Sequence, residues 1–323
     1  MSLENESLPY MVGGLLYTPA INGGVAEKIE KMAYPCLTSM AFCLEDSIRD
    51  DALDAAEIAL KMTLDKLCAS CINRDELPLL FVRVRDPEHL IHTDDMLGES
   101  AEILTGYILP KFDLSNSSEY IDAAVKLNKN HHRKVYIMPV LESIMIAGVK
   151  ERAGALLELK SQLDAVKDIV LNIRVGGNDF SNLYGLRRSV WQNVYQIGVI
   201  RDIMADIINV FAADYVVSGP VWEYFGSEPG MWSEGLSREA ELDRLNGFIG
   251  KTAIHPSQLP YIYESMKVTR SDYEDSLRIL NWTRSSHGVE KSADGSRMNE
   301  MKCHTKWASR IVMLAKIYGV RDA

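Results

Sequence analysis

The sequence has little positive charge and no long apolar run, and each shortage excludes a class of protein. The formal net charge is −10, whereas nucleic-acid binding needs clustered Lys and Arg to neutralise phosphates. No stretch approaches about 18 uninterrupted apolar residues, and the opening segment MSLENESLPY has acidic residues in place of the apolar core of a signal peptide. We therefore expect a cytoplasmic protein with neither nucleic acid nor membrane as a partner.

The cysteines are few and lack the spacing of a disulfide framework or a zinc site. There are five, an odd number, and only Cys68 and Cys71 form a CxxC, in CASC. A structural zinc site needs a second pair of ligands, and the sequence has no second CxxC and no HxxxH. We expect reduced thiols rather than a metal or redox pair.

Signals of a divided chain are also missing. The sequence shows no internal repeat, no low-complexity tract and no linker before about residue 268, which favours one continuous domain. An open doubly wound sheet usually carries a GxGxxG phosphate turn after its first strand. The corresponding run here is PAINGG, so that architecture is disfavoured.

Strand-like apolar runs recur along the chain and alternate with stretches of good helix formers such as 51–67, 143–163 and 187–211. The runs cover residues 13–20, 37–46, 77–85, 106–112, 134–142, 168–179, 213–221 and 247–256. Eight strands alternating with helices predict an α/β fold, a (β/α)₈ TIM barrel, at residues 1–268. Residues 269–323 turn helical and polar, so we expect a C-terminal helical extension that packs on the barrel or on a neighbouring subunit.

Charged residues close most of these strands, where active sites of such barrels form. They are Glu45, Asp46, Arg83, Arg85, Lys111, Glu142, Asp179 and His255. Carboxylates that converge on one rim without a cation would be unfavourable. Mg²⁺ takes one or two carboxylates together with waters and substrate oxygens, and Mn²⁺ suits the same ligands.

Strand alternation favours Glu142 and Asp179 as the metal ligands. Each ends a row of mostly apolar residues spaced two apart, which predicts that both face inward. Gly176 and Gly177 would leave room for a ligand close to the backbone. The alternative is that strand-terminal acids only cap the following helices, although Glu is a poor N-cap.

Arg83 and Arg85 lie on one face of the third strand, so at least one is expected at the rim. A guanidinium grips a carboxylate with two hydrogen bonds, as an anionic oxo-acid substrate requires. The alternative is a structural ion pair with Glu45, Asp46 or Asp86.

Read together, these strand ends resemble the citrate lyase β-subunit and HpcH/HpaI aldolase superfamily, and more closely its branch of carbon-carbon bond lyases of the TIM-barrel fold. The resemblance runs in order over about residues 13–260. It is carried by LLYTP, FCLEDSI, FVRVRD, MPVLES, RVGGNDFS and GFIGKTAIHPSQL. The last motif is the most specific.

The resemblance implies a set of roles for the strand-end residues. Glu142 and Asp179 match magnesium ligands, and Arg83 matches the arginine that holds the substrate carboxylate or oxo group. We assign catalysis to Arg83, Glu45, Asp46 and His255, and substrate binding to Arg83, Arg85, Lys111 and Lys251. His255 either transfers a proton or orients a neighbouring ligand.

Several departures from the superfamily's motifs place coenzyme A use in doubt. Members that use coenzyme A commonly carry an Arg before the first strand and a P-G-N-x-P-E turn after it, where this chain has Gly13, Gly14 and PAINGG. An Asn expected after the third-strand arginine is replaced by Arg85, and Phe42-Cys43 stands where an Asp is expected before the Glu-Asp pair.

The expected function is that of a Mg²⁺-dependent carbon-carbon lyase or aldolase, similar to citrate lyase β-subunits. It would act on a small oxo-acid such as oxaloacetate, pyruvate or glyoxylate through a metal-stabilised enolate. Two alternatives stay open: a metal-dependent lyase or hydrolase of acyl-coenzyme A thioesters, and a non-catalytic binding protein that kept the fold.

Two segments outside the strand ends carry further expectations. The aromatic residues of the loop at 218–235 would either exclude water as a lid or form a subunit contact. Residues after 268 carry apolar stripes that need covering, and the superfamily is oligomeric. We therefore expect a homo-oligomer.

Overall fold

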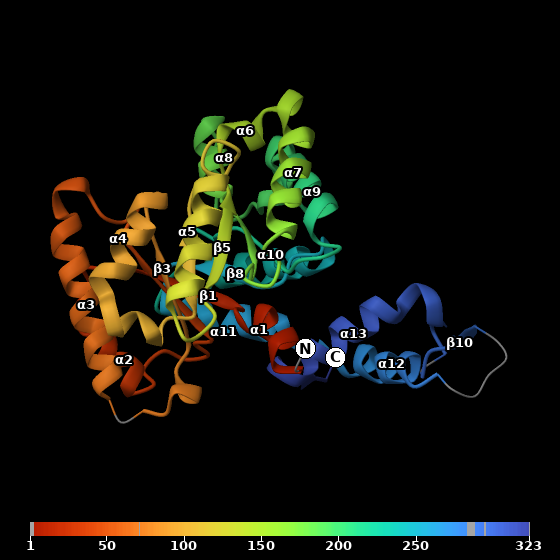
Figure 1. Cartoon of the computed structure of the whole chain (residues 1–323). Helices are drawn as coiled ribbons and strands as arrows, with labels where there is room; N and C mark the ends of the chain where they lie inside the picture. The colour runs from red at the N-terminus through yellow and green to blue at the C-terminus, as the bar shows by residue number, and fades with distance from the viewer. Residues whose placement is uncertain (1–2, 71, 283–287, 294, 323) are drawn as a thin grey trace. The chain divides into compact units, whose positions relative to one another are not determined.

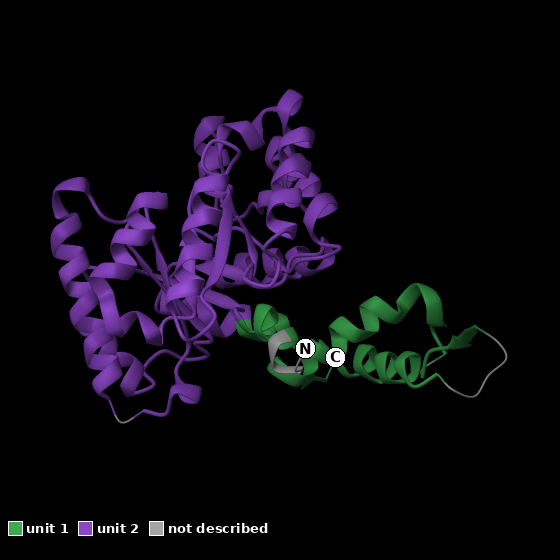
Figure 2. Cartoon of the chain, viewed as in Figure 1, with its two compact units in different colours: residues 1–11, 263–323 green, residues 12–262 purple. Residues whose placement is uncertain are grey.

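The computed structural model describes residues 3–70, 72–282, 288–293 and 295–322, and these form two compact units (Figure 2). The larger unit is Val12–Ile262, and the smaller combines Met1–Met11 with Tyr263–Ala323. The domain boundary expected at residue 268 stays a prediction, since compactness alone does not show independent folding.

The larger unit is built on eight parallel strands in the order β7-β6-β5-β4-β3-β2-β1-β8, of which Figure 1 labels β1, β3, β5 and β8. They are β1 (Gly14–Pro19), β2 (Ser39–Cys43), β3 (Leu79–Arg83), β4 (Gly106–Leu109), β5 (Tyr136–Leu141), β6 (Ile173–Val175), β7 (Val217–Ser218) and β8 (Lys251–Ala253). Each lies within one of the eight apolar runs.

Backbone contacts between β7 and β8 nearly close the sheet. The Gly219 amide donates to the Gly250 carbonyl at 3.0 Å, and the Ile249 amide donates to the Val217 carbonyl at 2.8 Å. A parallel bridge joins Gly219 to Lys251. The predicted (β/α)₈ barrel is confirmed.

Helices follow the strands and surround the sheet (Figure 1). The α-helices that begin in the larger unit are α2 (Val25–Glu30), α3 (Leu53–Ala69), α4 (Pro87–Leu97), α5 (Ser117–Asn130), α6 (Ile144–Ala147), α7 (Val149–Asp164), α8 (Gly177–Leu183), α9 (Gly198–Phe211), α10 (Met231–Leu245) and α11 (Leu259–Met266). Short 3₁₀ helices are η1 (Asp50–Ala52), η2 (Arg74–Glu76), η3 (Gly98–Ile103), η4 (Val194–Gln196) and η5 (Pro256–Gln258). None of the described helices is both long and apolar enough to cross a membrane.

Local sequence signals fix where the helix after β3 begins and ends. The Asp86 side chain accepts a hydrogen bond from the His89 amide at 2.8 Å, and Pro87 opens α4. Both are favoured at a helix N-terminus. Gly98, with φ of 58°, ends the helix in a conformation that favours glycine.

Helix α9 shows how the barrel core forms. Its buried residues recur once per helical turn and form one apolar face: Ile200, Ile203, Met204, Ile207 and Phe211. The sequence predicted this helix from residue 187, but it begins at Gly198. Asn193, a residue type favoured at helix N-termini, precedes η4 instead, and its backbone amide donates to the Gln196 side chain at 2.9 Å.

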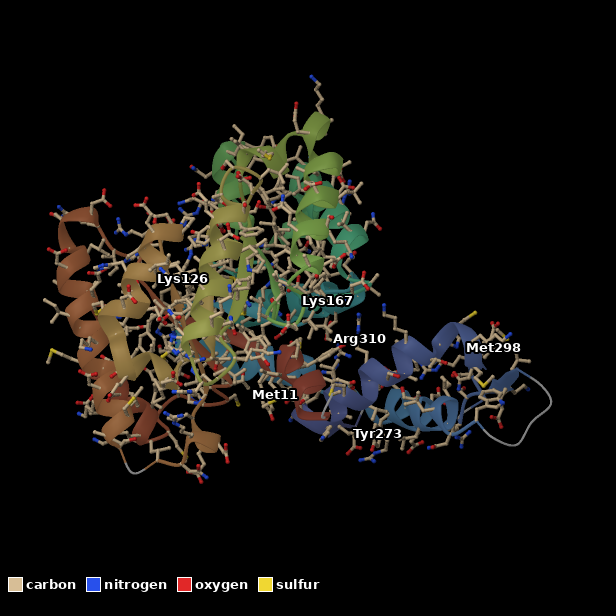
Figure 3. The ribbon with its side chains drawn as sticks, in the orientation of Figure 1. Met11, Lys126, Lys167, Tyr273, Met298 and Arg310 are labelled. Carbon is tan, nitrogen blue, oxygen red and sulfur yellow. The ribbon has the colours of Figure 1, made fainter. Side chains whose placement is uncertain are left out.

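The smaller unit contains α1 (Leu3–Met11), α12 (Arg270–Leu280) and α13 (Met301–Tyr318). Its strands are β9 (Val268–Thr269), β10 (Val289–Lys291), β11 (Met298–Glu300) and β12 (Val320–Arg321). Figure 3 labels Tyr273 on α12 and Arg310 on α13, the two helices that pack together. The helical extension is confirmed, while its short strands were not predicted. The apolar stripes bury Ile279, Ile311 and Leu314.

Candidate functional site

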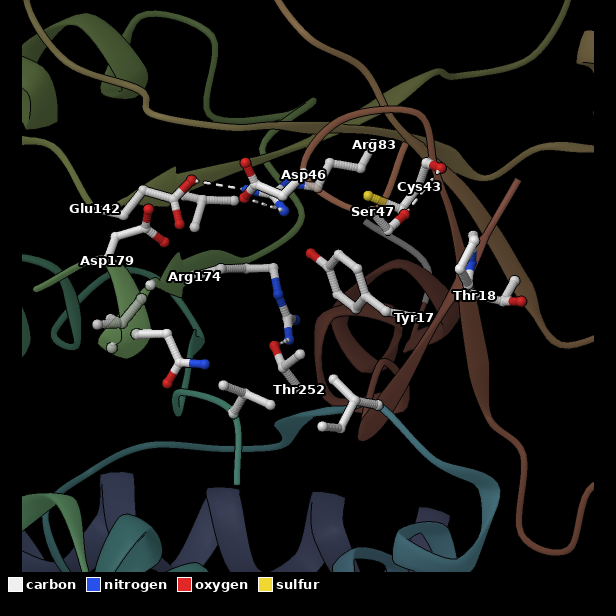
Figure 4. A pocket seen from close by; sticks show the side chains of 18 residues that line it. Tyr17, Thr18, Cys43, Asp46, Ser47, Arg83, Glu142, Arg174, Asp179 and Thr252 are labelled. Carbon is white, nitrogen blue, oxygen red and sulfur yellow. Dashed lines mark hydrogen bonds and ion pairs between the residues drawn. The ribbon is translucent and has the colours of Figure 1, made fainter. Parts of the chain in front are cut away.

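The carboxyl ends of the strands surround a cavity of about 430 Å³ in the larger unit (Figure 4). It is lined by Tyr17, Thr18, Pro19, Cys43, Asp46, Ser47, Arg83, Val140, Glu142, Arg174, Val175, Gly176, Gly177, Asn178, Asp179, Val221, Thr252 and Ile254. Four of the strand-end residues singled out from the sequence are in this lining: Asp46, Arg83, Glu142 and Asp179.

Arg83, at the end of β3, is the centre of an ionic cluster. Its Nη2 lies 3.0 Å from a carboxylate oxygen of Glu45 and 3.0 Å from one of Glu142, and its Nη1 lies 3.2 Å from Asp46. The guanidinium also lies over the Tyr17 ring at 5.9 Å. Both roles weighed for Arg83 are therefore compatible with its position, since it forms ion pairs and lines the cavity.

Lys111 joins the same cluster, although it is not among the cavity-lining residues. Its ammonium contacts Glu45 and lies 3.2 Å from Asp46. Burial raises the pKa of Glu45, against the effect of Arg83. For Asp46, burial is outweighed by a hydrogen bond with Glu45 and by the two cations, and its pKa is lowered.

Glu142 follows β5 and is buried against the backbone of two other elements. One carboxylate oxygen accepts a hydrogen bond from the Lys111 amide at 3.0 Å. A side chain at Gly176 would place its Cβ 2.0 Å from the other oxygen, so only glycine fits there. Burial, with a contribution from Asp179, raises the pKa of Glu142 to about 8, although Arg83 lowers it.

Asp179 reaches the cavity by a different route from the one the sequence suggested. Strand β6 ends at Val175, and Asp179 lies in the first turn of α8, so the two-residue alternation does not extend to it. Gly176 and Gly177 line the cavity, and the direction that a Cβ would take is occupied at each: a Cβ at Gly176 would meet Glu142, and one at Gly177 would lie 2.7 Å from Pro220.

The two carboxylates fit a magnesium site completed by other ligands. Figure 4 shows the Glu142 and Asp179 side chains next to each other at one side of the cavity, and the charge of Asp179 disfavours ionisation of Glu142. The described residues hold no metal-binding group of three or more His, Cys, Asp or Glu. Two carboxylates with substrate and water oxygens are the donor set that Mg²⁺ accepts.

Arg85 and His255 are directed elsewhere. Arg85 Nε donates to the Leu44 carbonyl at 2.8 Å and its Nη2 to the Ile48 carbonyl at 2.9 Å, so it supports the loop after β2. His255 Nδ1 accepts from the Ser257 amide at 3.2 Å, at the start of η5, and its ring stacks on Phe225 at 4.5 Å. Neither lines the cavity, and their predicted substrate-binding and catalytic roles stay predictions.

Lys251, the third residue directed away from the cavity, lies in a second, closed ionic cluster. It is 1% exposed, and its ammonium lies 2.9 Å from Glu239 and 2.7 Å from Asp243. Glu239 also binds Arg188 at 2.6 Å, and Asp243 accepts from the Tyr195 hydroxyl at 2.6 Å. These contacts point to a structural position, and the predicted substrate role of Lys251 stays untested.

The aromatic loop after β7 is anchored to the barrel. Trp222 is 1% exposed, and the Arg188 guanidinium lies 4.9 Å above its ring. The Gln258 amide donates to the carbonyls of Trp222 and Tyr224 at 2.8 and 2.9 Å. Phe225 remains 52% exposed. The first part of the loop, through Tyr224, therefore packs on the barrel, whereas the part that begins at Phe225 is more exposed.

Sequence reasoning missed Arg174, Tyr17 and Thr252 as cavity residues. Arg174 is the middle residue of β6 and is 1% exposed. Burial lowers its pKa below the ordinary value. A charge within an apolar run was a signal, but the assumed inward face of that run was the one with Ile173 and Val175.

Of the CxxC pair, the structure describes only the first cysteine. Cys68 is a free, exposed thiol, whereas Cys71 lies outside the described residues.

Solved structures with the same fold cover most of the chain. A citrate lyase from Burkholderia xenovorans has a TM-score of 0.70 at 14% identity over 96% of this chain and 93% of its own. The CitE protein of Mycobacterium tuberculosis in complex with magnesium, acetoacetate and coenzyme A has a TM-score of 0.61 at 20% identity, over 94% and 98%. Its complex with magnesium and pyruvate has a TM-score of 0.51 at 19% identity, over 80% and 92%.

At 14–20% identity, these solved structures show the fold alone. The family assignment therefore rests on sequence comparison. No curated protein matches the chain. The family described as carbon-carbon bond lyases of the TIM-barrel fold matches residues 6–320, which confirms both the resemblance and the prediction of a lyase. The chain therefore belongs to the family of carbon-carbon bond lyases of the TIM-barrel fold.

Proposed function

We propose that this protein is a Mg²⁺-dependent lyase that makes or breaks a carbon-carbon bond in a small, free oxo-acid. The observation that carries the proposal is the convergence of Glu142, Asp179 and Arg83 on one cavity. Two acids and a guanidinium are the groups needed to hold a cation and an anionic substrate together.

Glu142 and Asp179 would hold the metal, with the remaining positions open to water and to the oxo and carboxylate oxygens of the substrate. When bound, Mg²⁺ supplies Lewis-acid stabilisation of the negative charge that develops on the oxo oxygen. Arg83 adds hydrogen bonds to the same anionic end. On cleavage of a 4-hydroxy-2-oxo acid, the hydroxyl would lose its proton and become the carbonyl of the released fragment. The electron pair of the broken carbon-carbon bond would stay on the oxo-acid fragment as an enolate, which a proton then quenches.

The residues of the cavity limit which group can carry that proton. Tyr17 lines the cavity, and burial raises its pKa, so its hydroxyl stays protonated and can donate a hydrogen bond. His255 does not line the cavity and would act by holding the turn after β8. Glu45, Asp46 and Lys111 would position Arg83 and balance its charge.

Titration calorimetry with Mg²⁺ tests the metal site. We expect Glu142→Gln and Asp179→Asn each to weaken Mg²⁺ binding by about 100-fold or more, with circular dichroism unchanged. Glu88→Gln is the control, because Glu88 is an exposed acid in the first turn of α4 and is not among the cavity-lining residues. Unchanged affinity in both site variants would refute the metal assignment.

A thermal-shift screen with Mg²⁺ tests the substrate class. We expect oxaloacetate, pyruvate or glyoxylate to stabilise the protein more than acetyl-coenzyme A, because the coenzyme A motifs of the superfamily are altered. Stabilisation by acetyl-coenzyme A alone, with release of free thiol, would indicate the thioester-cleaving alternative. Failure to bind Mg²⁺ would indicate a binding protein that kept the fold.

We also propose a cytoplasmic homo-oligomer. The four described cysteines, Cys36, Cys43, Cys68 and Cys303, are free, as a reducing compartment requires. The apolar stripes of the extension no longer argue for assembly, because α12 and α13 pack together. Exposed apolar side chains such as Val149 (84%) and Ile144 (73%) support an interface instead. Light scattering tests this, and a monomer of 36.3 kDa would contradict it.

A further inference from the structure

Arg174 differs from the other buried cations of the protein. Among the described residues, five Arg and Lys side chains are buried, and four pair with a carboxylate: Arg83, Arg152, Arg188 and Lys251. No ion pair joins Arg174 to a carboxylate in the described part of the chain. An unpaired charge at 1% exposure is unfavourable, so a partner is expected.

The contacts of Arg174 leave part of its guanidinium unused. Nη2 donates to the Thr252 hydroxyl at 2.7 Å, and the guanidinium also interacts with the Tyr17 hydroxyl, whereas Nη1 is buried without any hydrogen-bond partner. Both residues line the cavity. Figure 4 shows the guanidinium turned toward Thr252 and away from Glu142 and Asp179. An oxo-acid end bound at those two acids therefore would not satisfy Arg174.

We infer that Arg174 binds a second anionic group of the substrate, a carboxylate at the end distant from the metal, so that the preferred substrate is an oxo-diacid. The inference rests on the proposed function. A small rotation of the guanidinium beside the cavity would bring Nη1 to that carboxylate and complete a two-point contact. Val221 and Ile254 line the same cavity and would pack on the carbon chain between the two ends.

Matched pairs of acids test the inference by calorimetry with Mg²⁺. The pairs are 2-oxobutyrate against oxaloacetate and 2-oxopentanoate against 2-oxoglutarate; within each pair only the distal methyl or carboxylate differs. We expect the wild-type protein to bind at least one of the two diacids about tenfold more tightly than the mono-acid of the same pair. Arg174→Met should remove this preference and leave the affinity for the mono-acid within about threefold.

Two further variants separate binding from a structural role. Arg174→Lys keeps a cation and should retain part of the preference, while Thr252→Val frees the guanidinium and should reduce it about threefold. If Arg174→Met does not fold, the diacid preferences of Arg174→Lys and Thr252→Val test the inference in its place. If every variant loses affinity for the mono-acid and for the diacid equally, Arg174 only bridges β6 and β8.

The outcomes also distinguish this inference from the proposed function. Mg²⁺-dependent binding of mono-acids without any preference for diacids overturns the inference alone, as does a preference that survives loss of the guanidinium. If no acid binds to the wild-type protein, the proposed function fails and the inference fails with it.

Discussion

Two ionic clusters lie in the barrel, and they differ in whether their contacts are complete. Around Lys251, two buried acids form ion pairs with the lysine and with an arginine, and one of them accepts a hydrogen bond from a tyrosine hydroxyl. Around Arg83, several groups border a cavity, and the acids of Glu142 and Asp179 repel each other. A closed cluster stabilises the fold, whereas an open one can take a ligand. Charge at a strand end alone does not distinguish them.

Lys251→Met should break the closed cluster and produce the largest loss of stability. Its removal leaves Asp243, at 2% exposure, buried without its cation, and leaves Glu239, at 0% exposure, with Arg188 alone. Breaking such a pair is unfavourable by about 3–5 kcal/mol, measurable by urea unfolding. Conversely, wild-type stability with lost oxo-acid binding would restore the substrate role predicted for Lys251.

Arg83→Met, at the end of β3, should affect ligand binding more than the same substitution of Arg85, which lies two residues after the strand. We expect affinity for the oxo-acid in Mg²⁺ to fall by about 2 kcal/mol, or roughly thirtyfold. Arg85→Met is the matched control, because Arg85 contacts loop carbonyls and lies outside the cavity lining. Calorimetry on both variants decides, and equal losses would contradict the assignment.

Gly176→Ala tests the open cluster without changing its charge. The added Cβ would meet the Glu142 carboxylate, and displacing a metal ligand should weaken Mg²⁺ binding about tenfold. Gly154→Ala, in the interior of α7, meets nothing within 4 Å and should raise stability by up to about 1 kcal/mol. Unaltered Mg²⁺ affinity in Gly176→Ala would show that Glu142 has room to move.

A third ionic group, around His131, should give the smallest effect. Burial lowers the pKa of His131, but hydrogen bonds to Asp94 and Glu102 outweigh it and the net shift is upward. The stabilisation is therefore fully present below the ordinary pKa of about 6.5 and is lost as the pH rises through the raised value. Unfolding of His131→Asn at pH 5.5 and 8.5 checks this: the variant should lose more stability relative to wild type at the lower pH.

The sequence was sufficient to predict the barrel, because eight apolar runs alternate with helix formers and each contains a strand. It also indicated Arg83, Glu142 and Asp179, which do line one cavity. Their chemical roles stay predictions.

What could not be predicted depends on side-chain direction and pairing. The assumption that Ile173 and Val175 face inward concealed Arg174, since β6 is only three residues long and α8 begins at Gly177. Lys251 and Arg85 were indistinguishable from cavity residues because their partners lie on other elements, such as Asp243 on α10 for Lys251.

Lys111 is a position at which the charge of the site could be changed by substitution. It has a φ of 49°, a backbone conformation that disfavours a residue with a Cβ, and its amide holds Glu142 while its ammonium contacts Glu45. Lys111→Gly would relieve that strain and keep the amide contact while removing one positive charge. Protein engineers could in this way retune the electrostatic potential of the cavity without displacing the proposed metal ligand.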